Sequence, residues 1–308
     1  MTDAALYREQ KAPFHLFSQR WKTMDLVDIT DWASDEVRKI SISQTFLTAP
    51  YEVRVRKFVS HPGDMLAEKW VNDGNIKTFP IPPYGMVDMV EAACSVGAMI
   101  EREVANYINK TICPNTGDGL VWETYVAAFR WANQAPVRLR LLVISGPAES
   151  ILTSFKTTRE QTILCDAFRL WVSCRLASQP DQIVGEDKLG MKTVDDPSSP
   201  YQDLVPTPPV LGAQLECILY SRFLRPLARR VLRELLALME TRQPCYWYTI
   251  YLVLFLMLHN CSMMTRRDME YAAQVSLGVS LDRKDTACCQ EFSSVDVMID
   301  RILQPREH

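Results

Sequence analysis

Four histidines and nine cysteines are the residues of this chain best suited to hold a metal ion, and their spacing predicts no such site. A zinc-binding helix presents two ligands one turn apart, whereas His15, His61, His259 and His308 are scattered along the sequence. The only neighbouring cysteines are adjacent in sequence, so their side chains diverge, and no Cys-x-x-Cys pair occurs. We therefore expect no metal ion and no other cofactor.

Short motifs of common enzymes are also missing. The sequence has no glycine-rich loop followed by Lys-Ser or Lys-Thr, and no Gly-x-Ser-x-Gly. Asp195 and Asp196 could begin an acidic metal-binding motif, but their Pro- and Ser-rich surroundings favour a solvated loop. His259 ends an apolar run, which is typical of a hydrogen-bonded core imidazole. We predict no catalytic residue; the alternative is a helical enzyme that uses these groups around an apolar pocket.

A stripe of arginines is the best candidate for an interaction surface. Residues 214–242 carry aliphatic side chains at steps of three and four, which predicts an amphipathic helix interrupted near Pro226. Four arginines fall on a different face of that helix: Arg222, Arg225, Arg229 and Arg233. They could contact phosphate or an acidic partner. The alternative is that they only solvate the outer face, assisted by Glu234 and Glu240.

Composition indicates a globular protein without an electrostatic signature for nucleic acid. Of the 308 residues, 47% are hydrophobic and 23% are charged, and the net charge is -3. Proteins that bind nucleic acid usually present a basic face, which this balance does not suggest. Residues 1–21 contain no apolar run, so they resemble neither a secretory signal nor a transit peptide. We therefore expect a protein that is made and kept in a reducing compartment.

One long uncharged stretch, residues 243–265, raises the question of a membrane span. A span needs about 20 apolar residues. The strictly aliphatic and aromatic part, residues 250–258, covers only about two and a half helical turns. We therefore expect the central helix of a soluble core, apolar on all sides because other helices surround it. A membrane span at residues 246–264 is the alternative.

The pattern along the chain predicts an all-α, irregular multi-helix fold with little or no strand. Further helices are expected at 84–108, 120–134 and 160–177, whereas residues 51–58 read as a short, unpaired extended segment. Residues 178–212, rich in Pro, Ser and Asp, are expected to form a long loop.

That loop divides the chain into five parts. We expect an N-terminal tail at 1–18, a first helical part at 19–177, the loop at 178–212, a second helical part at 213–275 and a C-terminal tail at 276–308.

Two blocks of the sequence, residues 19–89 and 245–274, carry a family resemblance. The first contains Ile-x-x-x-Gln at residues 40–44, Tyr-x-Val-x-Val-Arg-x-Phe at 51–58 and Gly-Asp-x-Leu-x-x-x-Trp at 63–70. These blocks resemble the regulatory region of fungal binuclear-zinc-cluster transcription factors. The resemblance implies a mostly helical nuclear protein, with the cytoplasm as a second location, that regulates a nutrient or secondary-metabolite pathway.

The sequence departs from that family at one decisive place. No six-cysteine cluster precedes residue 19, and the first cysteine is Cys94. The resemblance therefore implies a co-regulator that makes no specific DNA contact of its own and acts through a DNA-binding transcription factor. A truncated, non-functional relative and a ligand-responsive role remain as alternatives, and the sequence assigns no effector.

Overall fold

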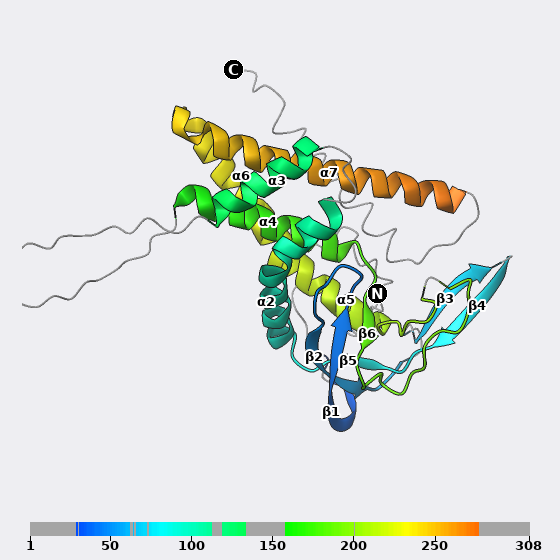
Figure 1. Cartoon of the computed structure of the whole chain (residues 1–308). Helices are drawn as coiled ribbons and strands as arrows, with labels where there is room; N and C mark the ends of the chain where they lie inside the picture. Colours follow the sequence, from blue (N-terminus) through cyan, green and yellow to red (C-terminus); the bar gives the residue numbers. More distant parts are fainter. Residues whose placement is uncertain are drawn as a thin grey trace, which may run out of the picture.

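The computed structural model describes residues 29, 31–61, 64, 66–72, 74–112, 119–133, 158–199 and 201–276. Within these ranges, one antiparallel sheet and one separate hairpin lie at one end of the protein, and a group of helices lies at the other (Figure 1). The expectation of an all-α fold is wrong.

The main sheet has four antiparallel strands in the order β5-β2-β1-β6. They are β1 (Trp32–Ser43), β2 (Tyr51–Phe58), β5 (Tyr84–Met86) and β6 (Gln182–Val184). Buried and exposed residues alternate in β2, because one face of the sheet packs on the core and the other meets solvent. The segment expected to be unpaired is thus bonded on both sides, by β1 and β5.

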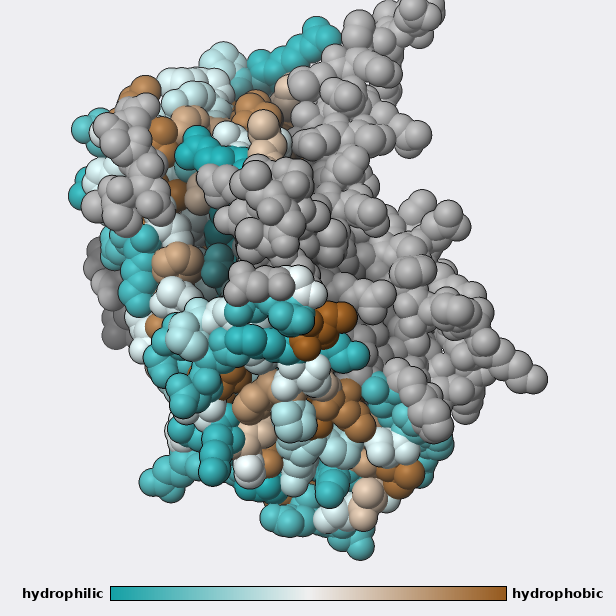
Figure 2. Space-filling model, turned by 90° about the vertical axis from the view of Figure 1, so that its right-hand side faces the viewer, coloured by the Kyte–Doolittle hydropathy of each residue, from teal (hydrophilic) through white to brown (hydrophobic). Residues whose placement is uncertain are grey.

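A two-stranded hairpin of β3 (Ala67–Asn72) and β4 (Asn75–Pro80) forms the second sheet. Gly74 lies in its turn at a φ of 77°, where a residue with a β-carbon is strained. Trp70 and Phe79 pack against Val194 and Tyr201 of the segment expected to be a long loop. On the face shown in Figure 2, the coloured lower half, at the level of the sheets, mixes hydrophobic and hydrophilic residues.

The helices are α2 (Met89–Tyr107), α3 (Gly119–Ala132), α4 (Arg159–Ala177), α5 (Pro209–Ile218), α6 (Arg225–Glu240) and α7 (Trp247–Ser276). Short turns of other helix types follow three of them: η2 (Ile108–Ile112), η3 (Leu219–Leu224) and η4 (Pro244–Tyr246). Helix α4 is the central one, since 12 of its 19 residues are buried, Trp171 among them. It packs against α2, α3, α6 and α7.

Helix α7 is not the surrounded central helix that we expected. Leu252, Val253 and Leu256 are buried on one side, but Trp247 is 65% exposed and Leu258 is 53% exposed. Among the described residues, the helical stretch Pro244–Arg266 is the one long and apolar enough to cross a membrane, and 33% of its most apolar part is buried in the protein. Core helices of soluble proteins have the same length and composition, so these two properties alone do not indicate a span.

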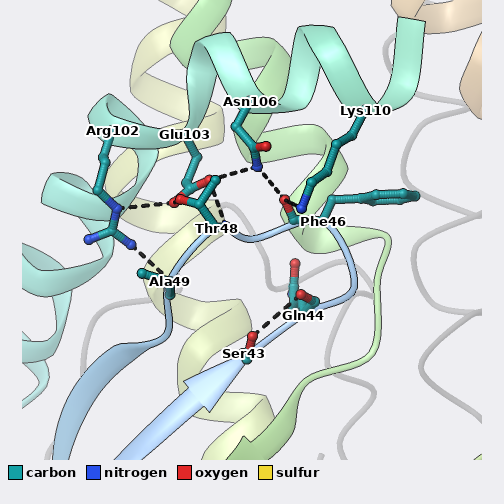
Figure 3. A network of polar contacts seen from close by, with 9 residues as sticks. All are labelled: Ser43, Gln44, Phe46, Thr48, Ala49, Arg102, Glu103, Asn106 and Lys110. Carbon is teal, nitrogen blue, oxygen red and sulfur yellow. Dashed lines mark hydrogen bonds and ion pairs between the residues drawn. The ribbon is translucent and has the colours of Figure 1, made fainter. Parts of the chain in front are cut away.

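Glu103 of α2 anchors the turn between β1 and β2 (Figure 3). Its side chain is 0% exposed, and its carboxylate accepts hydrogen bonds from the backbone N–H of Thr48 at 3.0 Å and the Thr48 hydroxyl at 2.5 Å. Arg102 and Asn106 donate to the same carboxylate. Burial alone would raise the pKa of Glu103, but these hydrogen bonds outweigh it and lower the pKa below its ordinary value.

Gln44, at the start of the same turn, joins the sheet to the end of α4. Its Nε2 donates to the carbonyl of Leu176 at 3.0 Å and to the carboxylate of Asp181 at 2.9 Å. Gln44 is 4% exposed, so these bonds satisfy a polar group that would otherwise be costly to bury. The glutamine of the Ile-x-x-x-Gln motif therefore has a structural role here.

Candidate interaction surface on helix α6

Helix α6 continues from α5 through a wide turn that precedes Pro226. In that turn, η3, the backbone N–H of Arg225 donates to the carbonyl of Tyr220, five residues earlier. Proline has no N–H and its ring crowds the carbonyl four residues before it, so a wider turn accommodates it. The sequence thus predicted the interruption near Pro226, although the helix does not break.

Phe223 holds the wide turn against α2. A β-carbon added at Gly97 of α2 would lie 3.3 Å from the tip of the Phe223 ring, which is a very close contact. The two elements therefore approach closely because residue 97 has no side chain.

Three of the four predicted arginines form an exposed row. Arg222, Arg229 and Arg233 are exposed, and none has an ion pair or hydrogen bond to the residues that the structure describes. Arg225 is half-buried and interacts within the protein, so it does not belong to the row. Of the two acids expected to assist, Glu234 pairs instead with Arg159 of α4 at 2.9 Å.

Arg230, next to the row, forms an ion pair that connects α6 with α4. Its Nε lies 2.5 Å from Oδ2 of Asp166 on α4, and its Nη2 donates to Oδ1 at 2.8 Å. Arg169 also pairs with this carboxylate, at 3.1 Å. Asp166 is almost fully buried, so the pair joins this side of α6 to the core, whereas Arg229 and Arg233 lie on the outside.

The unpaired row differs from the arginines of the main sheet. Arg38 pairs with Asp187, Arg54 with Glu91 and Arg56 with Asp35, so each of these strand arginines has a carboxylate partner. Arginines at the sheet thus have partners within the protein, whereas the row on α6 has none among the described residues.

Two hydrophobic residues extend the row toward the end of α6. Leu236 is 41% exposed and Met239 is 47% exposed, and Leu236 lies three residues after Arg233, on a neighbouring position of the helix surface. We refer to Arg222, Arg229, Arg233, Leu236 and Met239 as the α6 surface. These two hydrophobic members were not singled out from the sequence, although Leu236 lies at helical spacing from Arg229 and Arg233.

The acidic pair at 195 and 196 does not face a metal site. Asp196 accepts a hydrogen bond from Lys77 of β4 at 2.8 Å and others from Ser198, which lower the pKa of Asp196 to about 2. Asp195 is exposed. Among the described residues, no cluster of His, Cys, Asp and Glu could hold a metal ion.

His259 lies in a mostly aromatic environment. Its Nδ1 is 2.9 Å from the hydroxyl of Tyr125, and its ring stacks on Phe255. Burial lowers the pKa of His259, and the charges of Arg175 and Arg266 lower it further. No carboxylate contacts it in the described part of the chain, so the geometry is that of the expected core imidazole.

The other candidates fall elsewhere. His61 pairs with Asp31 at 3.1 Å on the surface. His15, His308 and the adjacent cysteines lie outside the described residues.

The comparison with family models decides the kind of protein. The model described as KpeA transcription factor matches residues 8–295, nearly the whole chain. The chain belongs to the KpeA transcription factor family. Neither a search of curated proteins nor a search of solved structures finds a match.

Membership in the KpeA family identifies a transcriptional regulator. The resemblance seen in the sequence thus led to the right kind of protein. Its narrower content, a zinc-cluster regulatory region without the cluster, is not tested by the family match and stays a prediction.

Proposed function

We propose that this KpeA-family chain is a nuclear co-regulator of a pathway-specific gene set, for which a secondary-metabolite pathway is the expected class. It acts by binding a DNA-binding transcription factor and makes no specific DNA contact of its own. Family membership supports the regulatory role, and the resemblance to zinc-cluster regulatory regions supports the rest.

The observation that carries the protein-partner mechanism is the mixed character of the α6 surface. Arginines without a partner in the described part of the chain lie beside exposed Leu236 and Met239. Arginine and methionine are enriched in protein interfaces, whereas hydrophobic side chains gain nothing from a phosphate backbone. A net charge of -3 also disfavours broad attraction to DNA.

Transcript measurements test the regulatory role. We expect that deletion of the gene changes the transcripts of its genomic neighbours under inducing conditions. The double variant R229E/R233E should give the same changes, because it reverses the charge of the row. Arg130 of α3 is also exposed and unpaired among the described residues, so Arg130→Glu is the matched control and should behave as wild type. An unchanged profile after deletion contradicts the proposal.

A gel-shift measurement tests the mechanism. The purified chain alone should not shift promoter DNA of the affected genes at physiological salt, whereas nuclear extract that contains a partner should give a complex that also contains this chain. A tight, sequence-specific shift by the chain alone would show direct promoter binding instead.

A further inference from the structure

No acidic residue among those that the structure describes pairs with the arginines of the α6 surface. Arg229 and Arg233 are one helical turn apart, and like charges at this spacing repel each other. Arg222 adds a third cation in the preceding turn. Carboxylates placed opposite the row would relieve this repulsion and form charge-assisted hydrogen bonds with the guanidinium groups.

The α6 surface also belongs to a helix that is held firmly by the rest of the protein. The opposite side of α6 is buried through Leu227, Val231, Leu235 and Leu238. The Arg230–Asp166 ion pair adds a directional contact with α4. A partner would therefore find the backbone of the row already in place, and binding would cost little ordering of this element.

Charge and hydrophobicity are separated along the surface. The three arginines come first, and Leu236 and Met239 follow at the end of the helix. From Arg222 to Met239 the surface extends about 26 Å, by the rise of 1.5 Å per residue. A helix laid beside α6 has the same rise, so acidic residues one turn apart followed by hydrophobic residues would stay in register with it.

From this charge complementarity we infer that the α6 surface docks an acidic amphipathic helix of the partner transcription factor. The carboxylates of that helix pair with Arg222, Arg229 and Arg233, and its hydrophobic residues cover Leu236 and Met239. This inference rests on the proposed function, since it names the chemistry of the partner at that surface.

A synthetic helix provides the direct test. The probe is a fluorescein-labelled, alanine-based peptide with Glu opposite the three arginines and Leu opposite Leu236 and Met239. Fluorescence anisotropy with the full chain should show saturable binding. R229E/R233E should weaken it at least tenfold, and Leu236→Ser with Met239→Ser should weaken it several-fold. Arg130→Glu should leave it unchanged.

Charge exchange separates a specific contact from loss of fold. A probe with Lys in place of Glu should bind R229E/R233E better than it binds the wild type, while the melting temperature of the variant stays close to that of the wild type. Failure of the Lys probe to recover binding to a folded variant overturns the inference.

Two further outcomes count against this docking mode. A scrambled probe of the same composition that binds equally well shows attraction by charge alone. Short duplex DNA that binds more tightly than the peptide, and loses binding in R229E/R233E, shows a phosphate site. The transcript measurement is independent: a changed profile after deletion, together with no peptide binding, rejects the docking mode but keeps the regulatory role.

Discussion

Arg230 of α6 and Asp166 of α4 form a two-point ion pair, with Nε 2.5 Å from Oδ2 and Nη2 2.8 Å from Oδ1. The side chain of Asp166 is 3% exposed and that of Arg230 is 50% exposed. The pair thus reaches from the core to the surface and connects the central helix with the helix that carries the arginine row. Its neighbour Arg229 makes no such contact with the described residues.

The two adjacent arginines should differ in their effect on stability. Arg230→Ala should lower the free energy of unfolding by about 1–3 kcal/mol, because a nearly buried carboxylate loses hydrogen bonds from a charged donor. Half of Arg230 is exposed, so the loss should stay below that of a fully buried pair. Arg229→Ala should change stability by at most about 0.5 kcal/mol. Urea unfolding of both variants checks this, and equal effects would show that the pair is not stabilising.

Glu103 should contribute stability that depends on pH. Glu103→Gln should lower the free energy of unfolding by about 1–3 kcal/mol at neutral pH, because the carboxylate accepts several hydrogen bonds in a buried position. The pKa of Glu103 is lowered in the folded protein, so this contribution is complete above the ordinary value of 4.5. It is lost as the pH falls through the folded pKa.

Unfolding curves between neutral and acid pH measure the effect at Glu103. The difference between wild type and variant should be constant near neutrality and shrink below about pH 4. Glu123 of α3 is exposed, and Glu123→Gln is the control without such a difference. A gap that persists unchanged into strong acid would mean that packing, not charge, is responsible.

His259 should make the protein less stable in mild acid. The pKa of His259 is lowered by burial from the ordinary value of 6.5, so the unfolded chain takes up a proton that the folded chain resists. The free energy of unfolding is therefore unaffected by His259 above pH 6.5 and decreases as the pH falls below 6.5. The slope from this group is at most about 1.4 kcal/mol per pH unit. In His259→Gln the slope of unfolding free energy between pH 5 and 6.5 should be smaller. The same slope in the variant and the wild type would show that another group is responsible for the loss of stability in mild acid.

The two sides of α7 should respond differently to substitution. Leu256 is 1% exposed, and Leu256→Ala should cost about 2–5 kcal/mol of unfolding free energy because it leaves a cavity. Leu258 is 53% exposed, and Leu258→Ala should change stability by at most about 0.5 kcal/mol. Thermal melts of the purified chain compare them. A large loss at Leu258 would mean that further parts of the chain cover this side, and recovery in carbonate-resistant membranes would favour the span.

Sequence reasoning located most helices because their periodicity is local. The expected 84–108, 120–134 and 160–177 lie close to α2, α3 and α4. It failed at the sheet, since β5 and β6 have three residues each and show no pattern, and the first half of β1 is rich in charged and small residues. These strands are defined by pairing with partners far away in the sequence; Ile42, for example, lies opposite Ile183.

At the candidate site, the sequence found the arginines but not their environment. Helical spacing put Arg225 with the other three, yet the wide turn before Pro226 and the packing around it place Arg225 half inside the protein. Leu236 and Met239 were not assigned to a face from the sequence, and the structure shows that both are exposed. Only the neighbours of a helix decide which of its hydrophobic residues are covered.

By itself, the sequence determined that this is a helix-rich relative of transcription factors with an arginine stripe on both sides of Pro226, since periodicity, composition and motifs are properties of the chain alone. The tertiary structure decided that α4 rather than α7 is central, that a four-stranded sheet supports the helices, and that three arginines have no ion-pair partner among the described residues. The physical reason is that burial and ion pairing depend on contacts between distant segments, and local sequence does not specify those contacts.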